Sequence, residues 1–326
     1  MIFKGWIEKC GHILSGSEVK ELTPETLTDC GGEFYIETED FRARDKYGII
    51  QGNVAPATIQ TASGILKINP IVPDLSLEEA IIEAVSLRKN TDAVVSLSGG
   101  VDSSLVAVLS GLKAICVGTE HSHDLLEAEK LSDKLGIDLS IHLITQEEAA
   151  EAFLKVISVL PAVTPINAEI ALTGYFAARL ANSLGAKRIL TGQAADELFA
   201  GYARYSSAEN LRAELDKDFE GLYAQRERDS AAAALFDIVY SMPYMDERVV
   251  KASKKLAPSE LVSGDQRKIA LRKTAEKYLP ADTAWKPKKA MQYGSGISKI
   301  LERIAHENGV KNTAGLIEKY YTKREQ

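Results

Sequence analysis

Hydrophobic and polar residues follow two different patterns along the chain, with a change near residue 75. Before it, short apolar runs typical of strands are separated by turns, and these runs cover residues 34–37, 47–50 and 64–68. Pro70 and Pro73 interrupt the pattern at the junction. We therefore expect two domains, a small β-rich one over 1–74 and a larger one over 75–326.

The larger domain begins with Ser76 and Glu79, a capping box that predicts a helix. Apolar strands then alternate with helical patterns. We expect strands at 93–97, 113–118, 138–143 and 187–191, and helices after the first strand and at 124–136, 146–159 and 168–184. This alternation predicts an α/β fold in which helices flank a parallel sheet and ligands bind at the carboxyl ends of the strands. Beyond residue 205 the pattern is mostly helical.

The first strand of this domain leads into a glycine-serine loop. The sequence Ser98-Gly99-Gly100-Val101-Asp102-Ser103-Ser104 stands between two apolar runs, an order typical of a strand, a tight turn and a helix. Paired glycines let the backbone approach a ligand, and the N–H groups at the helix start suit an anion. We expect the serine hydroxyls to donate to a phosphate and Asp102 to bind Mg²⁺. A glycine turn capped by serines is the alternative. Dinucleotide and Walker loops are excluded, because the loop lacks a third glycine and a Gly-Lys-Ser/Thr sequence.

This loop resembles the Ser-Gly-Gly-x-Asp-Ser pyrophosphate loop of the N-type ATP pyrophosphatases, and the chain resembles the synthetase domain of class B asparagine synthetases. A second stretch, Leu190 to Tyr202, is similar to the family's Ser-Gly-Glu-Gly-(Ser/Ala)-Asp-Glu-(Leu/Val)-Phe-Gly-Gly-Tyr. Two further matches follow in the family's order: Pro243-Tyr244-Met245-Asp246 after Arg228-Asp229, and Trp285-Lys286-Pro287-Lys288 after Leu279-Pro280 and before Gly294-Ser295-Gly296. The resemblance covers roughly residues 77–300.

The resemblance implies a Rossmann-like fold of the adenine nucleotide α-hydrolase type that binds ATP and Mg²⁺. It assigns nucleotide contacts to Leu97, Ser98, Gly99, Gly100, Asp102, Ser103, Ser104, Val117, Gly118, Thr191, Gly192 and Gln193. Leu97 and Val117 are the positions at which the family holds adenine. Asp102 and Asp196 are the implied metal pair and, with Lys288, the implied catalytic residues. Asp124 is a further candidate near the nucleotide, for which a helix N-cap is the alternative.

The implied reaction has two steps. A carboxylate, by default that of aspartate, attacks the α-phosphorus of ATP and releases pyrophosphate, and a nitrogen nucleophile then expels AMP from the acyl-adenylate. Negative charge develops on the phosphate oxygens, so a positioned cation is the expected catalytic group. The resemblance gives this role to Lys288, assisted by Lys286 at the family's arginine position. A solvated run of surface lysines is the alternative.

The chain departs from the family on the acceptor side. Gln193 replaces a glutamate, and an amide cannot act as a general base. Ala194 and Ala200 replace glycines, which predicts less demanding backbone angles or a local rearrangement. The family's Glu-x-Arg is also missing, since Val239 and Ser241 occupy those places. The substrate-side helix carries Asn167 and Glu169, and no arginine to pair with an α-carboxylate.

The N-terminal domain resembles a shortened glutaminase domain. Gly31 to Phe34 and Arg42 to Gly48 are similar to that domain's last segments. The family's glutaminase uses a cysteine at position 2 whose free amine acts as the base, whereas this chain has Ile2 there. We therefore expect ammonia, not glutamine, as the nitrogen source on this chain, with a separate glutaminase as an open partner.

Composition limits the remaining alternatives. The net charge of -7 gives no electrostatic argument for binding nucleic acid or an anionic membrane, and no apolar run is long enough to span a bilayer. The cysteines Cys10, Cys30 and Cys116 show no metal-ligand spacing, and with the absence of a signal peptide they predict a cytoplasmic protein. Two alternatives stay open: a relative that modifies a tRNA base or closes a β-lactam ring, and a nucleotide-binding subunit of an amidotransferase. A homodimer is also open.

Overall fold

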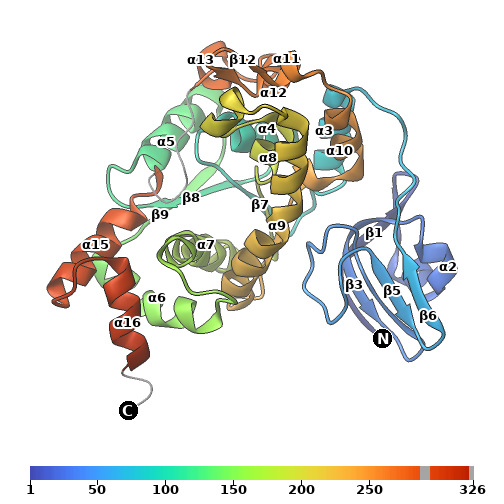
Figure 1. Cartoon of the computed structure of the whole chain (residues 1–326), viewed down its shortest axis with the longest axis horizontal. Helices are drawn as coiled ribbons and strands as arrows, with labels where there is room; N and C mark the ends of the chain where they lie inside the picture. The colour runs from blue at the N-terminus through green and yellow to red at the C-terminus, as the bar shows by residue number, and fades with distance from the viewer. Residues whose placement is uncertain (287–293, 323–326) are drawn as a thin grey trace. The chain divides into compact units, whose positions relative to one another are not determined.

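The computed structural model describes residues 1–286 and 294–322 (Figure 1). The chain divides into two compact units, each assembled from three segments. Unit 1 contains Met1–Lys89, Gly192–Arg226 and Tyr240–Thr274, and unit 2 contains Asn90–Thr191, Glu227–Val239 and Ala275–Gln326. The division of the chain at residue 75 into a remnant and a synthetase domain stays a prediction.

Unit 1 begins with a six-stranded antiparallel sheet in the order β2-β1-β3-β4-β5-β6. Its strands are β1 (Ile2–Lys9), β2 (His12–Ile13), β3 (Gly31–Glu37), β4 (Phe41–Arg44), β5 (Thr58–Thr61) and β6 (Gly64–Lys67). The short helices α1 (Gly16–Lys20) and α2 (Pro24–Leu27) begin at side-chain caps from Ser15 and Thr23. The sheet and these helices enclose an apolar core that includes Ile7, Leu27, Phe34, Ile36 and Ile59.

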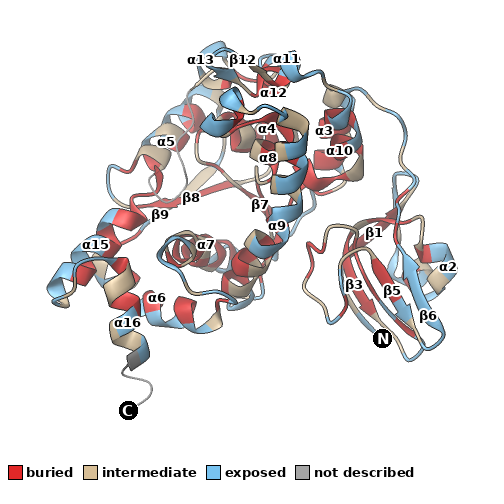
Figure 2. Cartoon of the chain, in the orientation of Figure 1, coloured by how far each residue is buried: buried red, intermediate tan, exposed pale blue. Residues whose placement is uncertain are grey.

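Burial differs along this sheet. Figure 2 shows the inner strands in red, whereas β6 at the edge is exposed at all four positions. The predicted strand over 47–50 was wrong, because Asp45 folds this segment into a turn. The carboxylate of Asp45 accepts N–H bonds from Tyr47, Ile49 and Ile50 at 3.0–3.1 Å, so these N–H groups are not available to a neighbouring strand.

The rest of unit 1 is mainly helical, as predicted beyond residue 205. It contains α3 (Leu77–Ser86), α8 (Ala195–Phe199), η1 (Ala203–Ser207), η2 (Pro243–Met245), α10 (Glu247–Lys254), α11 (Pro258–Leu261) and the hairpin of β12 (Val262–Ser263) and β13 (Gln266–Arg267). Three elements have residues in both units: α9 (Leu211–Ala234), β11 (Val239–Ser241) and α12 (Ile269–Ala275). The capping box of Ser76 and Glu79 begins α3, as predicted.

Unit 2 contains the predicted sheet. The strand order is β11-β10-β7-β8-β9, and the pairings between β10 (Arg188–Leu190), β7 (Ala93–Ser96), β8 (Ala114–Gly118) and β9 (Leu139–Leu143) are parallel. The helices are α4 (Val101–Ser110), α5 (His123–Leu135), α6 (Gln146–Val159), α7 (Pro165–Ser183), α13 (Ala281–Ala284), α15 (Ile297–Glu307) and α16 (Thr313–Thr322). Helices α5 and α7 both pack against β8, and Figure 1 shows one above and one below it. The α/β fold with helices flanking a parallel sheet is confirmed.

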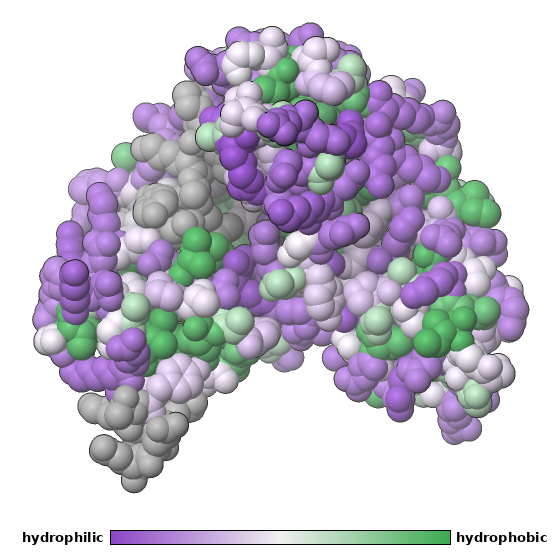
Figure 3. All heavy atoms as spheres, in the orientation of Figure 1, coloured by the Kyte–Doolittle hydropathy of each residue, from purple (hydrophilic) through white to green (hydrophobic). Residues whose placement is uncertain are grey.

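Most element boundaries agree with the sequence predictions to within two residues. Helix α6 matches its prediction at both ends, because Thr145 and Glu148 form a capping box that marks its start. Helix α7 begins three residues earlier than predicted, since Thr164 caps it and Pro165 stands at its first position. On the face drawn in Figure 3, hydrophilic residues predominate over smaller hydrophobic patches.

Candidate functional site

The glycine-serine loop forms the predicted strand, turn and helix at the carboxyl end of β7. Leu97 is buried directly after the strand, and Gly99 has a φ of +71°. A Cβ on Gly99 would lie 2.5 Å from the Cβ of Glu127, so the close packing on α5 requires glycine. Gly100 is the N-cap of α4 and provides no side-chain cap for its first turn. The positive end of a ten-residue helix is thus presented next to this loop.

The serines of the loop hold its shape. The Ser103 hydroxyl accepts from the Ser98 N–H at 3.2 Å, lies 3.0 Å from the Ser98 hydroxyl and donates to the Gly100 carbonyl at 3.2 Å. Ser104 is fully buried, and its hydroxyl makes no hydrogen bond to any residue within 1–286 or 294–322. Asp102 is partly exposed on the first turn of α4. Of these side chains, those of Ser98 and Asp102 are the accessible ones.

The carboxyl end of β8 meets the late run of small residues. The Thr119 N–H donates to the Ser295 carbonyl at 2.9 Å. A Cβ on Gly296, whose φ is +80°, would lie 2.2 Å from the Thr119 hydroxyl, and one on Gly294 would lie 2.1 Å from the Asp124 carboxylate. Both glycines are therefore needed for this close approach. The structure brings together two motifs that lie about 170 residues apart in the sequence.

The structure also places the two residues at the end of β8 that the sequence predicts to contact the nucleotide. Val117 and Gly118 are buried at its end, and a Cβ on Gly118 would lie 2.4 Å from the Ser122 hydroxyl. Ser122, not Asp124, is the N-cap of α5, so the N-cap alternative for Asp124 was wrong. The Asp124 carboxylate instead packs against the Gly294 backbone.

A lysine lies beside the loop from the third motif. The ammonium of Lys286 forms an ion pair with Glu127, the residue on which Gly99 packs. Lys286 therefore brings positive charge to α5, the helix that borders the glycine-serine loop. Lys288, the predicted catalytic lysine, lies outside the described residues.

Two hydroxyl-bearing residues, Thr173 and Ser298, were missed by the sequence analysis. The Thr173 hydroxyl on α7 lies 3.3 Å from the Ser295 hydroxyl, and Ser298 on α15 donates to the Glu169 carboxylate at 2.5 Å. Nothing in the local pattern separates these hydroxyls from ordinary helix residues. Their only sequence signal is the glycine-rich run in which Ser295 stands.

An arginine from another element lies beside Asn167 on α7. Arg228 on α9 is buried, pairs with Asp229 at 2.7 Å and points a second nitrogen to the Asn167 amide oxygen at 3.4 Å. The helix itself carries no arginine beside Asn167 and Glu169, as the sequence analysis states, and the arginine at this place comes from α9. No local sequence pattern could show this contact, because Arg228 and Asn167 are 61 residues apart.

The second motif follows β10, where Thr191 is buried, and continues into unit 1 with Gly192 and Gln193. Ala194 and Ala200 begin and end α8 with φ values of +71° and +59°. The expectation of less demanding backbone angles was wrong, because both alanines keep the left-handed conformation that suits glycine.

Asp196 lies on the first turn of α8, where its carboxylate forms an ion pair of 2.7 Å with the buried Lys268. Asp102 and Asp196 belong to different compact units, so their role as a metal pair stays a prediction. Within 1–286 and 294–322, no three His, Cys, Asp or Glu side chains gather as a metal site would require. The donor set around Asp102 fits magnesium in the mode in which one carboxylate, water and substrate phosphates hold the ion.

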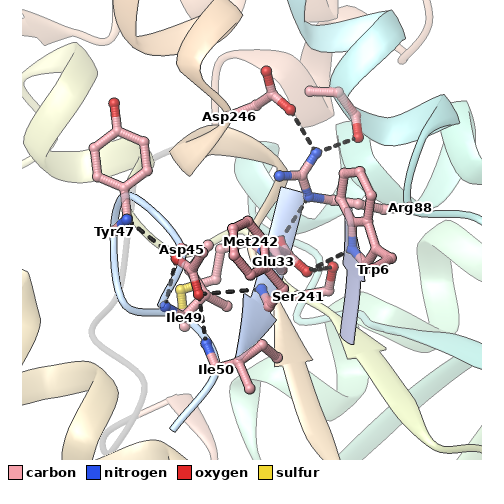
Figure 4. A network of polar contacts seen from close by, with 12 residues as sticks. Trp6, Glu33, Asp45, Tyr47, Ile49, Ile50, Arg88, Ser241, Met242 and Asp246 are labelled. Carbon is pink, nitrogen blue, oxygen red and sulfur yellow. Dashed lines mark hydrogen bonds and ion pairs between the residues drawn. The ribbon is translucent and has the colours of Figure 1, made fainter. Parts of the chain in front are cut away.

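Ser241 replaces the family's arginine and belongs to a buried network in unit 1 (Figure 4). At its centre the Glu33 carboxylate accepts from the Ser241 hydroxyl at 2.5 Å, the Met242 N–H at 2.9 Å and the Arg88 guanidinium at 2.7 Å. Arg88 also pairs with Asp246 at 2.8 Å. The departure at position 241 therefore has a structural explanation, since a serine fits beside a glutamate that another arginine already neutralises.

The protein-family model described as asparagine synthase matches residues 76–236 and 217–323 of this chain. A Methanocaldococcus jannaschii protein, named as a candidate glutamine-hydrolysing asparagine synthetase, is 33% identical over 280 residues, which are 72% of this chain and 51% of that protein. Asparagine synthetase B of Escherichia coli K12 is 25% identical over 338 residues, which are 92% of this chain and 57% of the enzyme. The chain thus spans about half the length of the curated relatives it matches.

Among solved structures, the NH3-dependent NAD synthetase of Campylobacter jejuni is 19% identical and covers 66% of this chain and 97% of its own, with a TM-score of 0.29. In the part of the chain that the structure describes, no helix has the length and apolar character needed to cross a membrane.

Proposed function

Because the chain belongs to the asparagine synthase family, we propose that it is an ATP-dependent amide ligase that activates a carboxylate as an acyl-adenylate. The observation that carries the proposal is the loop after β7. A left-handed Gly99 packed on Glu127 turns the chain so that the uncapped first turn of α4 is presented to an anion. ATP, with its triphosphate at this helix end, is the substrate that we assign to it.

The first step joins a carboxylate oxygen to the α-phosphorus and breaks the bond to pyrophosphate. The N–H groups at the start of α4 bind the phosphate oxygens, and the Ser98 hydroxyl adds a donor. Lys286, and Lys288 two residues later, provide the positive charge that balances the leaving pyrophosphate. Magnesium, when bound at Asp102, would neutralise phosphate charge. Leu97 and Val117 offer apolar contacts for adenine.

The second step joins nitrogen to the acyl carbon and expels AMP. We propose ammonia as the nitrogen source, because two of the three thiols are poorly suited to act as nucleophiles. Burial raises the pKa of Cys30 to about 11 and that of Cys116 to about 12, so neither forms a thiolate at neutral pH. The third, Cys10, lies exposed in the turn after β1. A separate glutaminase could deliver the ammonia.

Aspartate is the default acceptor that we propose. Gln193 offers no general base, so the nitrogen nucleophile must arrive as neutral ammonia. The Arg228 guanidinium beside Asn167 is the candidate partner for an α-carboxylate. We further propose that residues 1–74 are a glutaminase remnant without glutaminase chemistry.

The test is exchange of labelled pyrophosphate into ATP, with a panel of carboxylates and with or without ammonia. The proposal expects exchange with one carboxylate, and AMP with pyrophosphate as products once ammonia is added. Formation of ADP and orthophosphate would refute it, and exchange only with an RNA substrate would favour a tRNA-modifying relative.

A variant sharpens this test. Asp102→Asn removes the metal-binding carboxylate and should lower the exchange rate at least 100-fold, which about 2.7 kcal/mol of lost transition-state stabilisation would produce. Asp138→Asn, which removes a surface carboxylate paired with Lys113, is the matched control and should keep the wild-type rate. Equal rates for both variants would contradict the assignment of Asp102.

A further inference from the structure

Lys268 is a buried lysine to which neither the sequence motifs nor the proposed reaction gives a role. It follows β13 directly, and only 2% of the residue is exposed. Its ammonium lies 2.7 Å from Oδ1 of Asp196. Removing an ammonium from water is unfavourable unless an opposite charge replaces the solvent, so this contact accounts for the burial of Lys268.

The ion pair is packed against the backbone of Gly201. A Cβ on Gly201 would lie 1.8 Å from the Asp196 carboxylate and 2.4 Å from Cε of Lys268. The same glycine donates its N–H to the Asp196 carbonyl at 2.8 Å and accepts from Arg267 at 2.9 Å. Gly201 thus connects the segment that carries Asp196 to Arg267, the residue directly before Lys268.

Backbone strain is concentrated around the same pair. Ala194, Ala200 and Lys268 have φ values of +71°, +59° and +59°, which are unfavourable for any residue with a Cβ. Ala194 and Ala200 stand at the two ends of α8, the helix that carries Asp196. The third residue, Lys268, is the ion-pair partner of Asp196. Strained backbone persists only where the surrounding contacts fix it, and such positions gather at functional sites.

We propose that Lys268 is a positioning residue for Asp196. Its ammonium fixes the orientation of the carboxylate, balances its charge and holds the segment 194–201 in its strained conformation. The functional part of this proposal rests on the proposed ligase reaction and on the prediction from the sequence that Asp196 is one of its catalytic residues.

Thermal unfolding of the full-length protein tests the pair without reference to activity. Lys268→Met leaves the Asp196 carboxylate without its buried cation and should lower the melting temperature by several degrees. The double variant Lys268→Met/Asp196→Asn should recover most of that loss. Lys255→Met, which removes an exposed lysine paired with Asp74, is the control and should melt like the wild type. Additive effects of the two single changes would overturn the proposal.

The exchange reaction then separates a positioning role from a purely structural one. If Lys268 acts through Asp196, Lys268→Met, assayed below its melting temperature, exchanges pyrophosphate at least 100-fold more slowly than the wild type, and the double variant is no slower than Asp196→Asn alone. Recovery of both stability and exchange would overturn the positioning role. A wild-type protein that catalyses no exchange, but shows the non-additive melting, would refute the proposed ligase reaction and support the role of Lys268 in fixing Asp196.

Discussion

At the scale of single residues, the two glycines of the glycine-serine loop differ in whether a side chain could replace them. Gly99 is left-handed and leaves no room for a Cβ, whereas Gly100 has a φ of -77° and a Cβ there would meet only the Ser98 hydroxyl, at 3.6 Å. Of these two adjacent glycines, only Gly99 therefore stands at a position that requires glycine.

We expect Gly99→Ala to destabilise the protein by at least about 1–2 kcal/mol, the usual cost of the left-handed conformation, and to weaken ATP binding. Gly100→Ala should leave the melting temperature unchanged, because its backbone angles suit alanine. Melting curves with and without ATP measure both effects. Equal melting temperatures for the two variants would show that the packing on Glu127 does not fix the loop.

Asp45 gives a pH dependence at the same scale. Burial raises its pKa to about 6 from an ordinary 3.8, although N–H bonds from Ile49 and Ile50 act in the opposite direction. Between these values the folded protein binds more protons at Asp45 than the unfolded chain does. Its contribution to stability is therefore complete below about pH 4 and decreases as the pH rises through 6.

The expected decrease is roughly 2–3 kcal/mol, from a shift of about two units. Urea unfolding at several pH values, with Asp45→Asn as the reference, isolates it from the other carboxylates. We expect the stability of the wild type, relative to that variant, to decrease between pH 4 and 7. A difference that stays constant with pH would mean that the N–H bonds keep Asp45 ionised throughout.

Residue types in short motifs were predictable, but their local geometry was not. The loop from Ser98 to Ser104 was recognised from its glycines and the apolar runs beside it. The left-handed angles of Ala194 and Ala200 were missed, because alanine disfavours them and only tertiary contacts impose them. The pairing of Lys268 with Asp196 spans 72 residues, and no local pattern signals it.

At the scale of elements, buried charges join the N-terminal strands to the helices of unit 1. Trp6 and Glu8 lie on β1 and Glu33 on β3, and the two arginines that they contact are Arg88 after α3 and Arg248 on α10. Burial raises the pKa of Asp246, the cap of α10, but Arg88 and Arg248 outweigh it and hold that pKa below its ordinary value. Each guanidinium is therefore surrounded by carboxylates.

Arg88→Met would leave Glu33 and Asp246 without their shared cation. We expect a loss of about 3–5 kcal/mol of stability, the usual result of removing one partner from a buried ion pair. Lys113→Met, which breaks the surface pair with Asp138, should cost less than about 1 kcal/mol. Urea unfolding of the two variants compares them directly. Similar losses would indicate that water reaches the Arg88 network.

The elements predicted best from the sequence have an N-cap residue and apolar residues at regular helical spacing. Helix α6 was found at both ends because Thr145 marks its start and its apolar residues keep helical spacing. Strand β1 was missed, because Lys4, Gly5 and Glu8 interrupt any alternation of apolar and polar residues. The turn at Tyr47 was taken for a strand, because only the Asp45 side chain shows that the N–H groups there are already bonded.

At the scale of the whole molecule, the N-terminal residues are part of a compact unit that also includes 192–226 and 240–274. A chain shortened to 75–326 would lose Trp6, Glu8 and Glu33 and leave Arg88 and Arg248 with fewer buried partners. We expect this fragment to aggregate or to lack a cooperative unfolding transition, as measured by circular dichroism and gel filtration. A soluble fragment with a cooperative transition would show that residues 1–74 are dispensable for folding.

The parallel sheet and its flanking helices were predictable, since each depends on contacts near in sequence. The composition of the two units was not. Their segments are interleaved along the chain, and contacts such as Arg88 with Asp246, 158 residues apart, follow from tertiary packing alone.

This interleaving has a consequence for biosynthesis. At about 5–20 residues per second, the ribosome needs roughly 8–30 s between adding Arg88 and adding Asp246. During that interval the first strands have left the exit tunnel while the cations and anions that will neutralise one another are still in water or not yet made. Folding of unit 1 is therefore postponed until its last segment, which ends at Thr274, has been made, and helper proteins that shield the early strands would raise the yield of folded protein.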